Sequence, residues 1–384
     1  MTEQLYYSDS YLKEFDAMVL SSTLRSDGRY EIILDKTAFY PEGGGQPGDT
    51  GIIANVTVFD TQITDNSIIH ICSGYLEPGI KVHCLLNWER RFDYMQQHSG
   101  EHIISGIICS ELDCDNIGFH LGSETVTIDY NKYADINKIR EIEEIANRYI
   151  AEDHRVVISY PDENELSSLN YRSKKEIDND IRIVSFPGAD TCACCGTHLN
   201  SSAQAILVKV ISHKKFHDGM RLELLCGNRA VKHLLNCWEQ NAAVSRELSA
   251  PVDHTHDAVH KLLEQNEILK SKYSAAEEEL FRIISEQFIN KGNTYIIRED
   301  MESVSLRKLC DSIFHKCGGF CIVFSGHGNN YKYALMSSAD SFSSLIHDIN
   351  SELHGRGGGR DGLAQGTVIA DVDEINSYMS SIIK

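Results

Sequence analysis

Positive charge is scarce in this sequence: 36 lysines and arginines stand against 56 aspartates and glutamates, a formal net charge of −20 over 384 residues. This balance excludes a protein held to nucleic acid mainly by bulk positive charge, although it leaves room for a local basic patch. No apolar run comes near the ~20 residues that a membrane-spanning helix needs. Residues 1–10 are polar and acidic, so we expect no export signal and no contact with a membrane.

An evenly spaced disulfide framework is also missing. The chain has 12 cysteines, more than average, but they are not arranged like those of a small secreted domain. Without an export signal, we expect a cytoplasmic protein whose thiols are mostly reduced. Some of these thiols are then free to bind a metal ion.

The pattern of apolar and turn residues predicts an α+β protein with four regions. Residues 1–90 contain short strand patterns, among them one over Gly51–Phe59, which favours a small N-terminal β-barrel or sandwich. Residues 91–228 mix helix and strand patterns and are expected to form an α+β domain. Residues 229–290 are helical, and residues 291–384 are expected to form a C-terminal α/β domain containing a glycine-rich loop.

The helical region carries a heptad pattern after Pro251, with Asn266 at one of the inner positions. A buried asparagine fixes the register of a coiled coil, so the pattern is consistent with a homodimer through residues 229–290. A helical hairpin bent near Pro251 fits equally well, because periodicity cannot count chains. The heptad residues are Val259, Leu262, Asn266, Leu269, Tyr273, Ala276, Leu280 and Ile283.

Two motifs about ninety residues apart offer metal ligands. His98 and His102 are four residues apart in a helical run, so both imidazoles lie on one face of the helix. Cys194 and His198 add a thiolate and a third imidazole. One cysteine and three histidines form a ligand set suited to tetrahedral Zn²⁺. Either motif alone would be weak evidence, because the chain holds 17 histidines.

The role of such a metal stays open at this point. A structural zinc normally has its four positions closed by protein, whereas a catalytic zinc keeps one for water or substrate. Cys192 and Cys195 could compete as ligands or pack as small apolar residues. Glu101 lies beside His102 and points elsewhere on the helix, unlike the glutamate of H-E-x-x-H proteases.

A glycine run, Gly43–Gly45, precedes Gln46. Successive glycines can adopt positive φ and let a backbone approach another group closely. The run is typical either of a tight turn between strands or of a rigid turn that presents Gln46 to a ligand. Spacing alone does not choose between the two.

Residues 35–49, Asp-Lys-Thr-Ala-Phe-Tyr-Pro-Glu-Gly-Gly-Gly-Gln-Pro-Gly-Asp, resemble the start of the editing domain of alanyl-tRNA synthetases. The two metal-ligand motifs are similar to the pair shared by alanyl- and threonyl-tRNA synthetase editing domains. Gly118–Gly122 and Gly219–Glu223 also follow the family order, and His354–Gly366 resembles the signature of the C-terminal DHHA1-type domain. Because the chain begins at the editing domain, it resembles the long, free-standing AlaX type of alanyl-tRNA editing protein.

The resemblance implies a trans-editing hydrolase that deacylates tRNA-Ala mischarged with serine or glycine. It implies a zinc-dependent editing domain, with Zn²⁺ held by His98, His102, Cys194 and His198. In the substrate pocket it implies Thr37 as the group that meets a serine hydroxyl, with Gln46 and His120 as further catalytic candidates.

The resemblance also implies that the C-terminal domain grips tRNA, with Arg356 and Arg360 in the glycine-rich loop as phosphate contacts. Charge alone indicates a second contact, because Lys214, Lys215 and Arg221 cluster within the otherwise acidic editing half. Two alternatives remain open: editing of a mischarged tRNA-Thr, and a non-catalytic tRNA-binding protein with a structural zinc.

Overall fold

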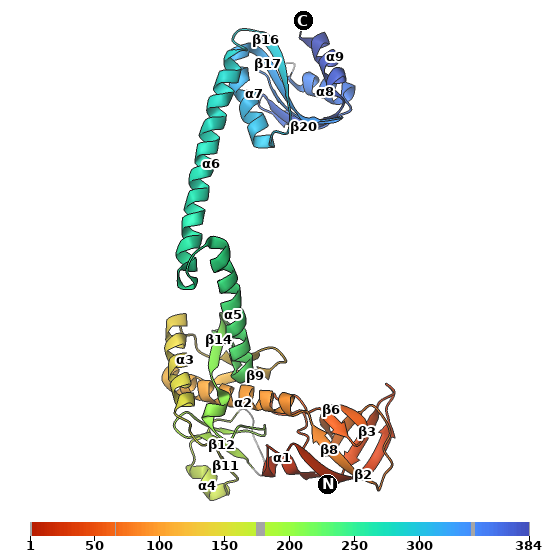
Figure 1. Cartoon of the computed structure of the whole chain (residues 1–384), viewed down its shortest axis with the longest axis vertical. Helices are drawn as coiled ribbons and strands as arrows, with labels where there is room; N and C mark the ends of the chain where they lie inside the picture. The colour runs from red at the N-terminus through yellow and green to blue at the C-terminus, as the bar shows by residue number, and fades with distance from the viewer. Residues whose placement is uncertain (1, 66, 174–180, 339–341, 384) are drawn as a thin grey trace. The chain divides into compact units, whose positions relative to one another are not determined.

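The computed structural model describes residues 2–65, 67–173, 181–338 and 342–383. They divide into two compact units, Met1–Ala243 and Val244–Lys384, and the mixed α+β content expected from the sequence is present in both (Figure 1). The predicted helical region is shared between the units: α5 (Gly227–Leu248) starts in the first, and α6 (Thr255–Glu286) lies in the second. Among the described residues, no helix is both long and apolar enough to cross a membrane.

The first unit begins with strands that close into a barrel. On its first strand, Phe15, Ala17 and Val19 are buried and the residues between them are exposed, as expected of a strand with one face on a core. The expected strand Gly51–Phe59 is interrupted at Ala54, whose φ of 52° turns the chain. In hydrogen-bonded order the strands are β2 (Glu14–Leu24), β3 (Tyr30–Leu34), β7 (Ser67–Cys72), β6 (Val56–Thr64), β5 (Gly51–Ile53) and β8 (Lys81–Leu86).

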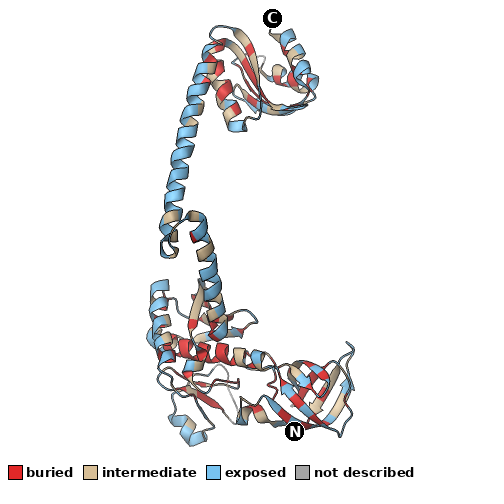
Figure 2. Ribbon diagram, in the orientation of Figure 1, coloured by how far each residue is buried: buried red, intermediate tan, exposed pale blue. Residues whose placement is uncertain are grey.

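Helix α2 (Trp88–Leu112) is the central element of the first unit. The Asn87 side chain caps its start by accepting a hydrogen bond from the Arg90 N–H at 3.2 Å. The middle of the helix is buried, as the red band in Figure 2 shows. It contacts elements on several sides, namely β9 (Asn116–Leu121), α3 (Ile136–Ala151), β13 (Asp190–Ala193), η1 (Ser202–Ala205), β14 (Val208–Phe216) and β15 (Gly219–Cys226).

The rest of the first unit consists of two further sheets and short elements near the N-terminus. One sheet has the order β14-β15-β10-β9 and the other β11-β12-β13. The remaining elements are β1 (Glu3–Gln4), α1 (Leu5–Ser8), β4 (Lys36–Thr37), β10 (Val126–Tyr130), β11 (Val157–Ser159), α4 (Glu163–Ser168) and β12 (Ile183–Phe186).

A buried ion pair fastens the barrel to α2. Arg91, in the first turns of α2, pairs with Asp49, and both residues are buried. The Arg91 guanidinium also donates to Ala38 O at 2.6 Å, while Asp49 Oδ2 accepts the Tyr40 N–H at 2.7 Å. Removing one partner of such a pair costs about 3–5 kcal/mol, because the other is left as a buried, unpaired charge. The pair therefore holds the loop that carries Gln46 against α2.

The second unit packs helices on both faces of one sheet of order β16-β17-β18-β20-β19. Alternate residues of β17 serve opposite faces: Cys321 and Val323 pack with α7 and Phe281 of α6, and Ile322 and Phe324 pack with α8 and α9. The elements are β16 (Gly292–Arg298), α7 (Ser303–Cys317), β17 (Gly318–His327), β18 (Asn330–Met336), α8 (Phe342–Glu352), β19 (Arg356–Arg360), β20 (Leu363–Ile369) and α9 (Val372–Ile382).

Most of the glycine-rich segment is a strand at the sheet edge, so the prediction of a loop over His354–Arg360 was wrong for Arg356–Arg360. Strand β19 pairs antiparallel with β20, and its five residues are exposed. A Cβ at Gly357 would lie 2.3 Å from the Tyr333 hydroxyl, and one at Gly359 would lie 2.0 Å from Leu363 O. The glycines are needed for close approach between strands rather than for a turn.

The heptad residues of α6 are largely exposed in the single chain, as the pale ribbon of α6 in Figure 2 shows. Leu269 is 64% exposed and Tyr273 70%. Only the end of the helix is covered, where Phe281 packs against α7. The structure of one chain therefore leaves the predicted coiled coil untested.

Candidate metal centre

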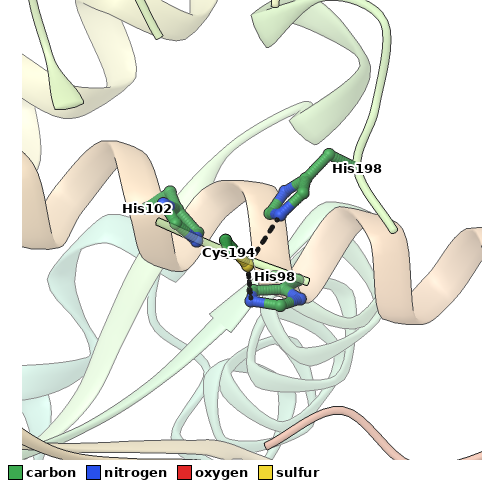
Figure 3. Close-up of side chains that lie close together, drawn as sticks. All are labelled: His98, His102, Cys194 and His198. Atoms are coloured by element: carbon green, nitrogen blue, oxygen red, sulfur yellow. Dashed lines mark hydrogen bonds between the residues drawn. The ribbon is translucent and has the colours of Figure 1, made fainter. Parts of the chain in front are cut away.

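Four side chains converge at the middle of α2 (Figure 3). His98 and His102 lie one turn apart on α2, and Cys194 and His198 lie on the loop after β13. Their ligand atoms are within 4.8 Å of one another. Cys194 Sγ is 3.4 Å from His98 Nε2 and 3.3 Å from His198 Nε2. The two motifs predicted from the sequence thus meet at one point.

His102 is oriented by a carboxylate that the sequence reasoning missed. Its Nδ1 lies 2.7 Å from Asp190 Oδ2. Arg172 grips the same carboxylate with two hydrogen bonds, from Nε to Oδ1 at 2.7 Å and from a terminal nitrogen to Oδ2 at 2.8 Å. Since a carboxylate accepts hydrogen bonds, Nδ1 carries the proton and Nε2 is directed to the cluster.

His98 is oriented by Gln46. Its Nδ1 lies 3.0 Å from Gln46 Oε1, which also accepts the Thr197 N–H at 3.1 Å. The amide nitrogen of Gln46 donates to Thr197 Oγ1 at 2.8 Å. Gln46 is fully buried and uses both ends of its amide on the ligand loop and on His98. Its observed contacts are those of a positioning residue.

His198 is oriented by Ser99. The Ser99 hydroxyl lies 3.2 Å from His198 Nδ1 and accepts the Leu199 N–H at 3.0 Å. Because Ser99 immediately follows His98 on α2, the helix supplies both a ligand and the group that orients another ligand. All three imidazoles are therefore held from Nδ1, which leaves each Nε2 for the cluster.

The electrostatics favour a thiolate and a neutral imidazole. Burial raises the pKa of Cys194, but the charges of His98 and His198 and two hydrogen bonds outweigh it and lower the pKa well below its usual range. Burial, together with the charge of His98, lowers the pKa of His198 to about 3. Burial also lowers the pKa of His102, but hydrogen bonds to Asp190 and Cys194 reverse this and raise it to about 9. The raised pKa of His102 means that the cluster attracts a proton. A metal cation can take the place of that proton.

The loop between Cys194 and His198 is shaped by two residues. Arg182 donates from one terminal nitrogen to Cys194 O at 2.7 Å and to Gly196 O at 2.9 Å. A Cβ at Gly196 would lie 2.2 Å from His98 Cε1, so only glycine lets the loop rest on the imidazole. The loop is therefore held in the shape that directs Cys194 into the cluster.

The glycine run before Gln46 is both a tight turn and a place of close approach. Gly44 and Gly45 have φ of 58° and 82°, and Gly43 and Gln46 exchange backbone hydrogen bonds at 3.0 Å. A Cβ at Gly45 would lie 2.6 Å from the ring of Phe119, which stacks on His98. The tight turn is thus confirmed, and this rigid turn presents Gln46 to His98 and Thr197.

Two of the predicted pocket residues have other surroundings. Thr37 is fully buried at the edge of the barrel, where its hydroxyl lies 2.8 Å from His70 Nε2 and accepts the Phe39 N–H at 3.1 Å. His120 is exposed on β9 and follows Phe119, whose ring faces His98. Because neighbouring side chains on a strand point to opposite faces, His120 points away from the cluster.

The other residues near the cluster also have defined contacts. Glu101 accepts hydrogen bonds from Ser105 and Asn116, each at 2.8 Å, and so points away from the ligands as expected. Cys192 is buried with His102 and Asp190 in an adjoining group of potential ligands. Cys195 is exposed and belongs to neither group.

Two of the three basic residues expected to contact tRNA in the first unit lie within ion-pair distance of acidic side chains. Arg221 forms a two-pronged pair with Asp129, its register partner on β10, at 2.6 and 2.7 Å. Lys214 is exposed and lies 3.7 Å from Glu223. Lys215 is exposed, as are Arg356 and Arg360 on β19. The guanidinium of Arg221 thus forms an ion pair within the sheet, and its contact with a tRNA phosphate stays a prediction.

Comparisons with known proteins place the chain in a family. Residues 2–90 match the family described as tRNA synthetases class II (A). The chain is 31% identical to the alanyl-tRNA editing protein AlaX-L of Pyrococcus horikoshii, over 98% of this chain and 96% of that protein. This chain belongs to the alanyl-tRNA editing protein family.

Two further relatives of this chain have a lower sequence identity, and one of them is a much longer protein. The chain is 29% identical to the alanyl-tRNA editing protein Aarsd1 of Danio rerio, over 74% of this chain and 73% of that protein. It is 28% identical to the alanine–tRNA ligase of Pyrococcus abyssi, over 100% of this chain but 43% of the ligase. The similarity thus covers less than half of the ligase.

Sequence reasoning singled out Gln46 but missed the residues that orient the other two histidines in this family member. Asp190 precedes Cys194 by four residues, but nothing in that spacing shows that its carboxylate reaches a histidine 88 positions earlier. The sequence likewise gives no sign that Ser99 contacts His198 or that Arg172 contacts Asp190. The usable signal is chemical, because a metal-binding histidine needs an acceptor on its other nitrogen.

Proposed function

We propose that the chain hydrolyses the ester bond of tRNA-Ala mischarged with serine or glycine. The observation that carries this proposal is the cluster of three imidazoles, each oriented from Nδ1, around the Cys194 sulfur. It is supported by similarity over nearly the whole chain to a protein named as an alanyl-tRNA editing protein. The reaction class is carboxylic ester hydrolysis by an aminoacyl-tRNA deacylase.

The chemistry of the ligands fits Zn²⁺. One thiolate and three neutral nitrogens form a borderline-soft set that favours zinc over the oxygen-seeking Mg²⁺ or Ca²⁺. His98, His102, Cys194 and His198 would hold the ion, and when bound it would supply a Lewis acid for the ester or for water. Around them, Asp190, Gln46 and Ser99 fix the imidazoles before any substrate arrives.

Thr37 is proposed to read the hydroxyl of a misplaced serine. The structure constrains how: His70 Nδ1 lies 3.0 Å from Ile32 O, which can only accept, so Nδ1 carries the proton. His70 Nε2 must then accept the Thr37 hydroxyl proton, and Thr37 can only accept a hydrogen bond from substrate. A serine hydroxyl can donate that hydrogen bond and an alanine methyl cannot. This difference would let an editing site distinguish Ser-tRNA-Ala from Ala-tRNA-Ala.

The exposed arginines of β19 are proposed to contact tRNA phosphates from the second unit. Arg356 and Arg360 stand at the two ends of a strand whose glycines leave the backbone uncovered between them. The apolar stripe of α6 is proposed to pair with the same stripe of a second copy, with Asn266 setting the register. Sedimentation equilibrium of the purified chain would show a dimer if this holds.

Two other functions remain to be separated from this one. Mischarged tRNA-Thr could occupy a site built from the same metal motifs, and a structural zinc could support tRNA binding without hydrolysis. We suggest incubating the purified protein with Ser-tRNA-Ala, Gly-tRNA-Ala, Ala-tRNA-Ala and Ser-tRNA-Thr and following loss of the aminoacyl group. Rapid loss from the first two substrates alone supports the proposal. Loss from Ser-tRNA-Thr alone, or from none, contradicts it.

A further inference from the structure

The C-terminal end of α2 brings two cysteines together. Asp113 ends the helix with φ of 48°, and the Cys114 N–H donates back to Cys109 O at 3.3 Å. In this type of helix ending, the side chains at the two ends of the hydrogen-bonded loop contact each other. The Cys114 thiol accordingly lies beside Cys109, where its sulfur is 3.8 Å from the carbonyl oxygen of the preceding residue, Ile108, and both cysteines are free thiols.

Cys109 has the surroundings of a reactive thiol. The neighbouring Cys114 thiol lowers the pKa of Cys109, against the effect of burial, and the charge of Arg172 and a backbone N–H from Asn116 lower it further. The same contact raises the pKa of Cys114, so Cys114 keeps its proton. Both side chains are only half-buried. A stabilised thiolate that solvent can reach, next to a second thiol, is the arrangement found at reversibly oxidised cysteines.

We propose that Cys109 and Cys114 form a reversible disulfide when the protein meets hydrogen peroxide. The Cys109 thiolate attacks one peroxide oxygen, the O–O bond breaks, and hydroxide leaves, so Cys109 becomes a sulfenic acid. The Cys114 sulfur then attacks the Cys109 sulfur, the S–O bond breaks, and the oxygen leaves as water with the Cys114 proton. Two electrons pass from the thiols to the peroxide, and a dithiol reductant restores both thiols.

A second cysteine pair in the same chain provides a built-in comparison. Cys310 and Cys321 also lie side by side, since the Cys310 thiol donates to Cys321 O at 3.3 Å, but both are 0% exposed. Peroxide can reach that pair only after local unfolding, whereas it can reach Cys109 in the native fold. The proposal therefore predicts that peroxide oxidises the partly exposed pair, Cys109 and Cys114, before the buried pair, Cys310 and Cys321.

The site lies at the end of the helix that carries two of the metal ligands. One turn before Cys109, a Cβ at Gly106 would lie 2.5 Å from Asp190 Cβ, so this part of α2 packs directly on the segment that orients His102. A disulfide would fasten the helix ending without touching the ligands. The proposal does not depend on the function proposed above.

Peptide mass analysis after limited oxidation tests the proposal. The full chain is treated with hydrogen peroxide, free thiols are blocked with iodoacetamide, and trypsin is added. Cleavage after Arg91 and Lys132 gives a peptide whose only cysteines are Cys109 and Cys114. We expect this peptide to lose two hydrogens and escape alkylation, and dithiothreitol added before blocking should restore both thiols.

Variants separate a disulfide from other outcomes. In Cys114→Ala, the oxidation should stop at a Cys109 sulfenic acid that dimedone traps, and in Cys109→Ala, Cys114 should stay fully alkylatable. The peptides of Cys310 and Cys321 should remain reduced under the same treatment. Unchanged alkylation of Cys109 and Cys114 after peroxide, or oxidation of Cys310 and Cys321 first, would overturn the proposal.

Discussion

Asp190 Oδ2 lies 2.7 Å from His102 Nδ1, and Arg172 holds both oxygens of the same carboxylate. Burial raises the pKa of Asp190, but hydrogen bonds from His102 and Arg172 outweigh it and keep the pKa below its usual value. The carboxylate therefore stays ionised beside His102. Asp190 thus links Arg172 to His102, one of the four candidate ligands.

Replacing Asp190 should weaken metal binding without removing a ligand. In Asp190→Asn the group facing His102 loses its charge, so both the tautomer and the ring orientation of His102 are less well fixed. We expect metal affinity to fall by about 10–100-fold, the usual effect of losing such a partner. Competition with a chromogenic chelator measures this, with Asp348→Asn, an exposed change in the second unit, as the control. Equal affinity in the two variants would refute the role of Asp190.

Gln46 offers a test on a second ligand. Gln46→Leu removes the acceptor for His98 Nδ1 and both hydrogen bonds to Thr197, so metal affinity should fall by about tenfold or more. Gln46→Glu keeps an acceptor at the same place and should retain most of the affinity. The same chelator competition compares the two. If both variants bind metal like the parent protein, Gln46 does not position His98.

Thr37 should control the preference for serine. Thr37→Val removes the hydroxyl that a serine side chain would meet, and the loss of one such hydrogen bond costs about 1–3 kcal/mol. The ratio of Ser-tRNA-Ala to Ala-tRNA-Ala deacylation should therefore drop by about tenfold, while Thr37→Ser should keep it. Single-turnover deacylation rates give the ratio. An unchanged ratio in Thr37→Val would end the proposed role.

His70 should make the barrel sensitive to acid. Burial lowers the pKa of His70 from 6.5 to about 4, so the folded barrel binds fewer protons than the unfolded chain between these values. The contribution of neutral His70 to the free energy of unfolding is fully present above pH 6.5. It is lost as the pH falls towards 4, by up to about 3 kcal/mol. Hydrogen exchange of β3 and β7 should speed up over this range. In His70→Gln the pH dependence should largely disappear, and its persistence would assign it to another group.

The sequence predicted those parts of the site that depend on local spacing. His98 and His102 face the same way because they are four residues apart on one helix, and Cys194 and His198 share one short loop. Asp190 could not be predicted as an orienting group, since it reaches His102 only through tertiary packing, and Gln46 was predicted as a site residue without its contact to His98. His120 was placed in the pocket by its motif, yet strand alternation points it away from the cluster.

The fold shows the same division between local and tertiary information. Strand β3 is one of the short strands that the pattern over residues 1–90 predicts. The segment Arg356–Arg360 was assigned to a loop because glycine favours turns, whereas close packing against β20 and Tyr333 makes it an edge strand. Tertiary contacts override local preference where a Cβ has no room.

The metal requirement of deacylation tests the central claim most directly. The measurement is the rate of Ser-tRNA-Ala deacylation by metal-stripped protein, with and without added Zn²⁺, for the parent chain, Cys194→Ala and the control Cys195→Ala. We expect the stripped parent and Cys195→Ala to be inactive and to recover with Zn²⁺, and Cys194→Ala to stay inactive and bind little metal. Full activity in the metal-free parent, or in Cys194→Ala, would contradict the account.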